Sequence, residues 1–345
     1  PDLMRLPTLL ARAALFALGA ASLARAAEPQ VIARGLDNPC GVAVQPGTNH
    51  VFVSTHPAIV RLVPGPGGFA RSDEVVDFAT DTYGRGPEYE IGPLGLAFFD
   101  KDTLIVGGGE LQDGAELVRF YSVGPAPRPA GQALKADAMK GFTGPIPAGD
   151  DSLRGEGNFF GIAIKGSNVF VSSNGDDTKG WVSRFVMKDG KPGPLTPFIA
   201  TKQETNVDGP TGLAISPDGK LVVSQFGEVN LPGDGLVVFY DPETGALEQK
   251  VKTGLNDPSG IAYSPKTGKL YCVDFSWSVP EKGGLFLLEN SGARMKPVRI
   301  AQLNHPSALA FAPDGTLYVT VIGIRDDSTE PATPQPGTVV IFKGL

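Results

Sequence analysis

A five-residue pattern, Pro-x-Gly-aliphatic-Ala, recurs six times along the chain and constrains the fold more than any single residue. The copies, the third and sixth of which are looser, occupy residues 39–43, 93–97, 159–163, 210–214, 258–262 and 306–310. Each copy is followed by a short turn, a second β-rich run and a third one, and most copies also have a weaker fourth run. Four antiparallel strands repeated in this way predict one blade of a β-propeller per copy. The sequence therefore predicts an all-β, six-bladed β-propeller.

The composition and the ends of the repeat agree with this prediction. The 45 Gly and 31 Pro residues favour strands and turns over helices. An additional strand at residues 30–33 has no partner within its own copy, and the last copy ends after its third strand at residues 338–343. We expect these two to pair and close the ring, because an open ring leaves exposed strand edges. A Pro/Gly/Ala-rich stretch, residues 125–155, is predicted to be a surface excursion rather than a domain.

The N-terminal residues match a secretory signal peptide. Met4 and Arg5 precede an apolar run at residues 13–21, and a small-x-small cleavage pattern follows at residues 24–26. We therefore predict a signal peptide over residues 1–26, of which 1–3 precede the initiator Met4, and a single propeller domain over 27–345. The apolar run is too short to span a bilayer, and no cysteine at the cleavage point offers a lipid anchor. We expect a periplasmic or secreted protein without a stable membrane anchor.

Charge and cysteine content narrow the partners. A net charge of -7 supplies no basic surface for a nucleic-acid backbone, so no nucleic-acid partner is expected. Cys40 and Cys272 are the only cysteines, and they fall in predicted blades that are not adjacent. We expect two free thiols rather than a disulfide.

The repeated motif, its turn and the β-run that follows resemble the NHL-repeat propellers and the gluconolactonase and regucalcin-like (TolB-like) superfamily of six-bladed propellers. The resemblance covers nearly all of the chain after residue 26. It implies the fold more than the function, because these propellers include lactonases, other hydrolases, lyases and binding modules.

The strand order places the candidate binding residues on one face. The loop that enters the first strand of a blade and the loop that leaves the second strand lie on the same side of the ring, and the long loops there are the usual place for binding. The candidates for a ligand-binding face are Cys40, His56, Phe226, Trp277, His305 and Arg325. Cys40 and His305 are also candidates for a nucleophile and its base. A small buried cysteine and a turn histidine is the simpler interpretation.

The acidic and amide residues of the same loops are candidates for a calcium site. They are Glu156, Asn158, Asn206, Asp208 and Asp274, and their oxygen atoms are the ligands that Ca²⁺ prefers. The resemblance implies a Glu from an early loop and Asn or Asp between the Pro and Gly of later motif copies. This sequence departs from that pattern, with Cys40, Leu94, Phe160, Thr211, Ser259 and Ser307 at the equivalent positions. Asn and Asp residues in loops also bond to their own backbone to stabilise turns.

Two functions remain open on the sequence alone. We expect an exported propeller that binds a small molecule or an extracytoplasmic protein on its long-loop face. The sequence assigns it no certain cofactor, and calcium is the candidate. The alternative is a calcium-dependent lactonase or related hydrolase of the gluconolactonase type. The sequence has no His-Glu-x-x-His, Cys-x-x-Cys or Gly-x-Ser-x-Gly motif, which favours the binding function over an enzyme.

Overall fold

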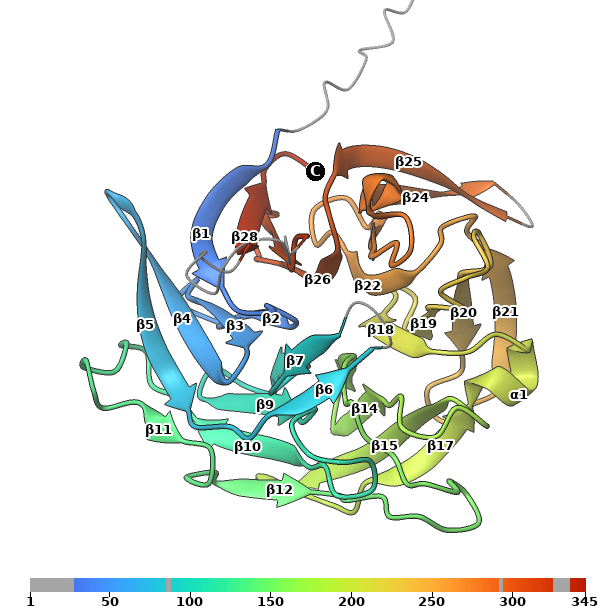
Figure 1. Ribbon diagram of the computed structural model, residues 1–345, viewed down its shortest axis with the longest axis horizontal. Coiled ribbons are helices and arrows are strands. Elements are labelled where there is room, and N and C mark those ends of the chain that lie inside the picture. The colour runs from blue at the N-terminus through green and yellow to red at the C-terminus, as the bar shows by residue number, and fades with distance from the viewer. Residues whose placement is uncertain (1–27, 85–87, 292–293, 325–335) are drawn as a thin grey trace, which may run out of the picture.

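The computed structural model describes residues 28–84, 88–291, 294–324 and 336–345. Within these ranges nearly all regular structure is β-strand, arranged in sheets around a common axis (Figure 1). The helices in this part of the chain are short, α1 (Thr201–Thr205) and the 3-10 helix Pro280–Lys282, and none has the length and apolar character to cross a bilayer. The fold is an all-β propeller. The predicted signal peptide and Arg325 lie outside the described residues.

The first three copies of the motif each begin a sheet whose strands follow one another outward from the axis. The first sheet contains β2 (Val42–Val44), β3 (Val51–Thr55), β4 (Ala58–Gly65), β5 (Gly68–Val76) and β11 (Leu134–Lys135). The second contains β8 (Leu96–Phe98), β9 (Thr103–Gly107), β10 (Val118–Ser122) and β12 (Gly141–Thr143). The third contains β13 (Ile162–Lys165), β14 (Asn168–Ser172), β15 (Trp181–Lys188), β16 (Lys191–Pro192) and β17 (Thr196–Ala200).

The last three copies lie in two further sheets. An eight-stranded sheet contains β18 (Pro210–Ile215), β19 (Leu221–Gln225), β20 (Leu236–Tyr240), β21 (Leu247–Lys252), β22 (Pro258–Tyr263), β23 (Leu270–Asp274), β24 (Gly284–Ser291) and β25 (Arg294–Gln302). It consists of two antiparallel runs of four strands, joined by a single parallel pair between Lys252 and Arg294. The remaining sheet contains β26 (Pro306–Phe311), β27 (Leu317–Val321), β28 (Gly337–Phe342) and β1 (Gln30–Leu36). β1 pairs antiparallel with β28, so the predicted pairing of the chain ends is confirmed.

Alternation along the second strand of a sheet explains how the sheets pack. On β3, Val51 and Val53 point to one side, into a cluster that also contains Tyr318 of the last sheet. Phe52 points to the other side, into a cluster with Leu104 of the second sheet. Successive strand residues face opposite sides of a sheet, so a strand between two neighbouring sheets must be apolar on both. This is why the second strands read as continuous runs such as Val-Phe-Val.

The glycine of the motif is explained by the close approach of the next copy. A Cβ atom on Gly41 would stand 2.1 Å from the carbonyl oxygen of Leu94, and one on Gly161 would stand 2.0 Å from that of Thr211. Neither glycine has a positive φ, so contact rather than backbone conformation demands the missing side chain. The sixth copy, which has Ala308 at this position, is the exception.

The residue between the Pro and Gly of the motif joins one copy to the next. The hydroxyls of Thr211, Ser259 and Ser307 donate hydrogen bonds to the carbonyl oxygens of the next motif prolines, Pro258 at 2.8 Å, Pro306 at 3.0 Å and Pro39 at 2.6 Å. The last of these bonds connects the sixth copy to the first. In the last three copies, the positions where the resemblance implies calcium ligands therefore carry hydroxyls that hold neighbouring copies of the motif together.

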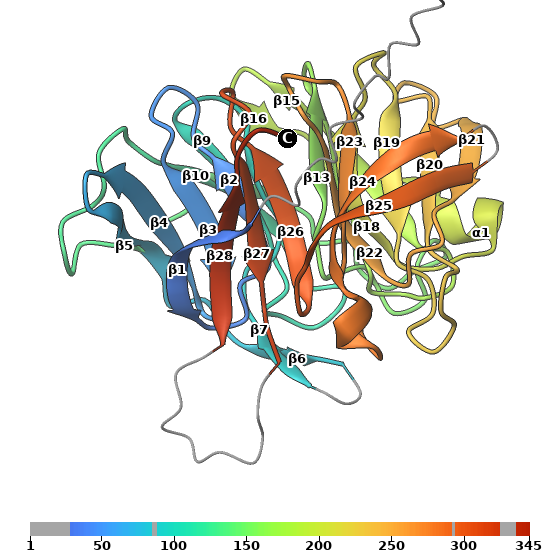
Figure 2. The ribbon, with the colours of Figure 1, turned by 90° about the horizontal axis from the view of Figure 1, so that it is seen from above.

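Two connections differ from a plain succession of sheets. Residues 125–155 are not only a surface excursion, because they supply β12, which extends the second sheet, and β11, which pairs parallel with β5 of the first. A β-hairpin that the sequence analysis did not predict, β6 (Asp81–Tyr83) and β7 (Tyr89–Ile91), follows the first sheet. It projects beyond the ends of the sheets (Figure 2) and lies across the middle of the ring (Figure 1).

Candidate functional site

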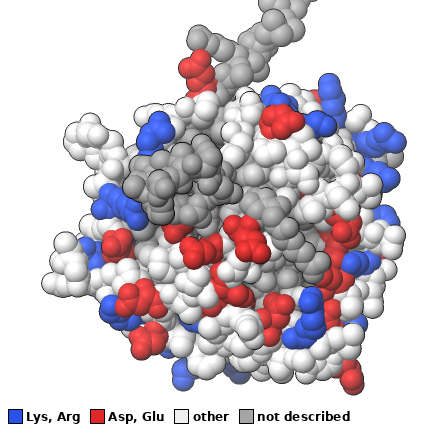
Figure 3. Space-filling view, in the orientation of Figure 1, with Lys and Arg blue, Asp and Glu red and all other residues white. Residues whose placement is uncertain are grey.

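The entering and leaving loops of each sheet meet on the face that carries the β6–β7 hairpin. Backbone hydrogen bonds join them, from Phe226 N–H to Gly209, from Phe275 N–H to Asp257 and from Ile322 N–H to His305. Asp and Glu side chains gather around the centre of this face, whereas Lys and Arg lie mainly toward its rim (Figure 3). The centre of this face is the candidate site.

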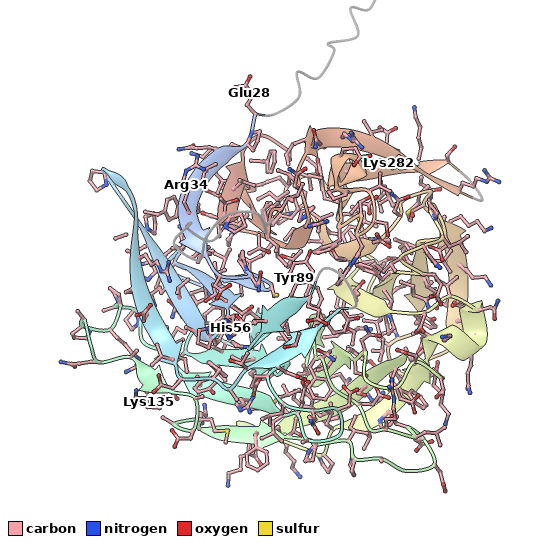
Figure 4. The ribbon with its side chains drawn as sticks, viewed as in Figure 1. Glu28, Arg34, His56, Tyr89, Lys135 and Lys282 are labelled. Carbon is pink, nitrogen blue, oxygen red and sulfur yellow. The ribbon has the colours of Figure 1, made fainter. Side chains whose placement is uncertain are left out.

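One half of the centre is an aromatic cluster. It is formed by Tyr83, Tyr89, Phe226, Phe275, Trp277 and His305. Tyr89 lies near the middle of the ring (Figure 4), with its ring edge against Trp277 at 5.3 Å between centroids. These rings pack on an apolar base that includes Cys40, Ile91 and Leu94. The hairpin therefore covers the central axis with aromatic side chains on this face.

His305 is held at the centre of the aromatic cluster. Its imidazole is 4% exposed, and the two ring nitrogens lie 3.3 Å from the Tyr89 hydroxyl and 3.3 Å from the Trp277 carbonyl oxygen. Burial lowers the pKa of His305, opposed by the carbonyl groups of Gly323 and Trp277. Nδ1 also lies 3.3 Å from the Gly323 carbonyl oxygen, so a neutral imidazole can donate to Trp277 from Nε2 or to Gly323 from Nδ1, but not to both.

The other half of the centre is acidic, and Glu116 is its most buried member. The Glu116 side chain has no exposed surface, and its Oε2 accepts a hydrogen bond from the backbone N–H of Asn158. Its Oε1 has no hydrogen-bond partner among the described residues. Burial raises the pKa of Glu116 to about 8, with further contributions from Glu110, Asp113 and Asp81. Such a carboxyl group is stabilised either by a proton or by a cation.

Asp113 and Glu116 face the same small space beside Gly157. A Cβ atom on Gly157 would stand 2.8 Å from Asp113 Oδ1 and 2.9 Å from Glu116 Oε2. The Asn158 amide lies 3.5 Å from Asp113 Oδ1. Because position 157 has no side chain, two carboxylates and one amide border this space, which we call the Gly157 cradle.

Tyr83 joins the two halves. Its ring packs edge-on against Trp277 at 6.1 Å, and its hydroxyl accepts a hydrogen bond from the Asn174 amide at 2.6 Å. Burial of the hydroxyl, together with the nearby carboxylates of Asp177 and Asp208, raises the pKa of Tyr83 to about 12. The Tyr83 side chain nevertheless remains 37% exposed. A molecule that approaches this boundary meets an aromatic ring on one side and carboxylates on the other.

Two of the predicted calcium ligands are fully used inside the protein. Glu156 is buried and accepts hydrogen bonds from the hydroxyls of Ser152 at 2.7 Å and Ser173 at 2.6 Å. Asp274 is 2% exposed and accepts the backbone N–H groups of Asn256 at 3.0 Å and Asp257 at 2.8 Å. Both carboxylates therefore use their oxygen atoms to hold the surrounding loops in place.

The other three predicted ligands are separated by their local roles. Asn206 is exposed and ends helix α1 in a left-handed conformation. Asp208 pairs with Lys202. Asn158 belongs to the Gly157 cradle, where its partners are Asp113 and Glu116. Of the five predicted ligands, Asn158 is the one that lies in the Gly157 cradle, next to the carboxylates of Asp113 and Glu116.

The five predicted ligand-face residues that the structure describes, all but Arg325, lie on this face and play different parts. Phe226, Trp277 and His305 belong to the aromatic cluster. Cys40 lies beneath that cluster, donates to the Asn38 carbonyl oxygen at 3.2 Å, and has a pKa that burial raises to about 12. A thiol held protonated in this way is a poor nucleophile. His56 lies farther from the axis (Figure 4).

Cys40 and Cys272 are both free and buried, as the sequence predicted.

Sequence reasoning missed four central residues, Tyr83, Tyr89, Asp113 and Glu116. The tyrosines lie in the hairpin, whose strands β6 and β7 have three residues each and give no clear alternating signal in the sequence. The two carboxylates lie in the loop between β9 and β10. Asp113 and Glu116 had no motif around them that could have distinguished them from solvated loop residues.

Fold and face together define a β-propeller with an aromatic and acidic centre. No protein-family model matches the chain, and no curated protein matches it in sequence. Solved structures match over nearly the whole length, including one described as glucose dehydrogenase, with 14% identity, a TM-score of 0.60, and 92% of this chain and 100% of that chain covered.

Two further solved structures show the same architecture. The soluble aldose sugar dehydrogenase of Escherichia coli has 14% identity and a TM-score of 0.58, with 91% of this chain and 98% of that chain covered. A calcium-binding protein, regucalcin, from Agrobacterium tumefaciens has 14% identity and a TM-score of 0.56, with 92% and 94% covered. At these identities the likeness establishes a propeller fold in common with the regucalcin-like proteins, and it leaves the activity to the site itself.

Proposed function

We propose that the protein is an exported, six-bladed propeller that binds a small polyhydroxylated molecule, such as an aldose or its lactone, at the centre of the hairpin-covered face. The observation that carries the proposal is the position of Tyr83, whose ring lies on Trp277 and whose hydroxyl accepts from Asn174. Sugars present C–H groups to aromatic rings and hydroxyl groups to carboxylates and amides. At Tyr83 the aromatic ring lies next to the Asn174 amide, so both kinds of contact are available side by side.

The blade number rests on the motif copies. Each of the first five approaches the next at its glycine, and Ser307 bonds back to Pro39 of the first copy. The eight-stranded sheet then counts as two blades, because a single parallel pair joins its halves. Export to the periplasm or beyond rests on the signal-peptide pattern of residues 1–26.

The kind of ligand is supported by the relatives in structure. Proteins described as glucose dehydrogenase and aldose sugar dehydrogenase share this fold at low sequence identity. The acidic half of the site suits hydroxyl donors, since a carboxylate accepts hydrogen bonds on both oxygens. Asp177 contributes an oxygen that solvent reaches, because its side chain is 63% exposed.

A binding assay tests the proposal. The protein is titrated with aldoses and aldonolactones by calorimetry and by tryptophan fluorescence, to which Trp277 contributes. We expect saturable binding of at least one sugar or lactone, a shift in emission, and loss of binding in Tyr83→Ala and Asn174→Ala. Phe142→Ala is the matched control, because Phe142 is an aromatic residue on β12 that is 51% exposed and lies outside the aromatic cluster.

Two results would contradict this function. One is the absence of saturable binding across the panel. The other is binding that Tyr83→Ala leaves at wild-type strength. Stoichiometric binding of an extracytoplasmic protein in place of a sugar would replace the small-molecule function with a protein-binding one.

A second candidate is a calcium-dependent lactonase, and the Gly157 cradle favours it. Asp113 Oδ1 and Glu116 Oε2 offer oxygen atoms to a hard cation there, and the same Glu116 carboxylate has a second buried oxygen, Oε1, with no hydrogen-bond partner among the described residues. Calcium, when bound, would supply a Lewis acid for a lactone carbonyl. Tyr83 and Trp277 would orient the sugar ring beside it.

Calcium dependence separates the two candidates. After EDTA treatment, added Ca²⁺ should raise the melting temperature, because a ligand bound only by the folded state stabilises it. Glu116→Gln and Asp113→Asn should remove that response, whereas Glu156→Gln should keep a calcium response because both Glu156 oxygens bond to serines. No response at millimolar Ca²⁺, or no hydrolysis of any aldonolactone, would exclude the lactonase and leave binding as the remaining function.

A further inference from the structure

A second group of metal-ligating side chains lies at the foot of the hairpin, away from the Gly157 cradle. Asp37 follows β1, His56 lies in the turn between β3 and β4, and Glu90 lies on β7. One ligand atom from each lies within 4.8 Å of the other two. Three segments that are distant in the sequence therefore bring one imidazole and two carboxylates together.

The group is oriented before any ion arrives. His56 Nδ1 lies 2.9 Å from Asp37 Oδ2, and its Nε2 lies 2.8 Å from the Thr80 hydroxyl. The amide of Asn38 donates to the Glu90 carbonyl oxygen at 2.8 Å and so fixes the backbone of β7 beside Asp37. Hydrogen bonds that orient the ligands reduce the cost of assembling a metal site.

The group is also accessible and short of positive charge. The His56 side chain is 12% exposed, that of Asp37 is 25% exposed, and Glu90 is exposed. Within the described residues neither carboxylate pairs with Lys or Arg. A cation can therefore reach the group without unfolding and, among the described residues, finds two carboxylates with no Lys or Arg partner.

The donor set selects the class of ion. One imidazole with two carboxylates suits a borderline divalent metal such as Zn²⁺, whereas Ca²⁺ takes six to eight oxygen ligands. Bonds of about 2.0–2.2 Å around a tetrahedral Zn²⁺ place the donor atoms roughly 3.4 Å apart. The Asp37–His56 pair must open slightly and the exposed Glu90 carboxylate must move inward.

We propose that Asp37, His56 and Glu90 bind one Zn²⁺-type ion that fastens the β6–β7 hairpin to the first sheet. The ion binds His56 Nδ1 in place of the proton that this nitrogen shares with Asp37, and that proton is released to solvent. A water molecule completes the coordination. Because Glu90 follows Tyr89, the ion also secures the tyrosine that packs at the centre of the face. The proposal does not depend on the sugar-binding function.

The experiment uses the full folded protein, stripped with EDTA and dialysed. We expect calorimetry to show one Zn²⁺ bound per chain. Zn²⁺ should also raise the melting temperature by a few degrees, and Ca²⁺ should cause no rise that depends on Asp37, His56 or Glu90. Glu90→Gln should weaken Zn²⁺ binding by at least about 10- to 100-fold. His56→Gln and Asp37→Asn should do the same. Glu90 is exposed, so its variant folds and keeps the test decisive if a substitution at His56 or Asp37 prevents folding.

The controls separate this group from other weak zinc sites. His50→Gln removes a histidine from the turn between β2 and β3 of the same sheet, and Glu88→Gln removes an exposed carboxylate next to β7. Both variants should bind Zn²⁺ as the wild type does. Unchanged affinity in Glu90→Gln and His56→Gln, or absence of a Zn²⁺-dependent rise in melting temperature, would overturn the proposal. Loss of sugar binding in Tyr83→Ala with zinc binding intact would show that the two sites are separate.

Discussion

The imidazole of His305 stacks on the ring of Phe275, with 4.6 Å between centroids and 9° between planes. This contact places a titratable group inside an apolar cluster, where burial lowers the pKa of His305. In the unfolded chain a histidine takes up a proton near pH 6.5. Its contribution to stability is therefore complete above that pH and is lost as the pH falls toward the lower folded-state pKa.

The first prediction concerns the free energy of unfolding of the wild type relative to His305→Gln. We expect this difference to shrink as the pH falls from 7 to 5, by about 1.4 kcal/mol for each unit by which the pKa is lowered. Urea unfolding at several pH values in EDTA measures it. His56→Gln is the control, because His56 faces Asp37 rather than an apolar cluster. An equal pH dependence in both variants would contradict the role of the stack.

The second prediction has the opposite sign and concerns Glu116. Its folded-state pKa of about 8 lies above the ordinary value, so the folded state binds a proton that the unfolded state has released between about pH 4.5 and 8. In EDTA the wild type should lose stability relative to Glu116→Gln as the pH rises through this range, by a few kcal/mol in total. Unfolding curves at pH 5 and pH 9 measure the change. Glu281→Gln, at an exposed carboxylate, should show no such trend.

The sequence predicted the features that depend on neighbouring copies of the repeat. The glycine of the motif, the runs such as Val51–Phe52–Val53 and the pairing of β1 with β28 follow from a pattern that each copy repeats. A sheet with apolar residues on both faces needs a neighbour on both sides, and this is visible in the residues themselves. The propeller could therefore be inferred before any contact was known.

The centre of the face could not be inferred in the same way. Glu156 and Glu116 are both loop carboxylates, yet Ser152 and Ser173 satisfy the first and Oε1 of the second has no partner in the described chain. That difference arises from contacts between loops that the sequence does not encode locally. The strands β6 and β7 have three residues each, too few to establish an alternating pattern.

The third prediction concerns the closure of the ring. The Ser307 hydroxyl donates to the Pro39 carbonyl oxygen at 2.6 Å and is buried. Ser307→Ala leaves that buried carbonyl without this donor, and we expect it to lower the free energy of unfolding by about 1–3 kcal/mol. Ser278→Ala, which removes a hydroxyl bonded to Val229 at an exposed position, should cost no more than about 0.5 kcal/mol. Equal losses in the two variants would argue against a closing role for Ser307.

The fourth prediction tests why the motif contains glycine. A Cβ atom on Gly161 would stand 2.0 Å from the Thr211 carbonyl oxygen, and the Ser172 hydroxyl holds that oxygen in place at 2.6 Å. Because the obstructing atom belongs to the backbone of the next copy, Gly161→Ala must push two sheets apart. We expect a loss of about 3 kcal/mol or more, at the upper end of the cost of overpacking.

Gly124→Ala provides the matched control for this fourth prediction. No atom lies within 4 Å of a Cβ atom at Gly124, and that glycine, like Gly161, has no positive φ. The control should be neutral or slightly stabilising, since alanine reduces the freedom of the unfolded chain. Chemical unfolding of the two variants compares the same substitution with and without a neighbouring copy. Equal stability would mean that the sheets can separate without cost, and the repeated glycine would then need an explanation other than close approach.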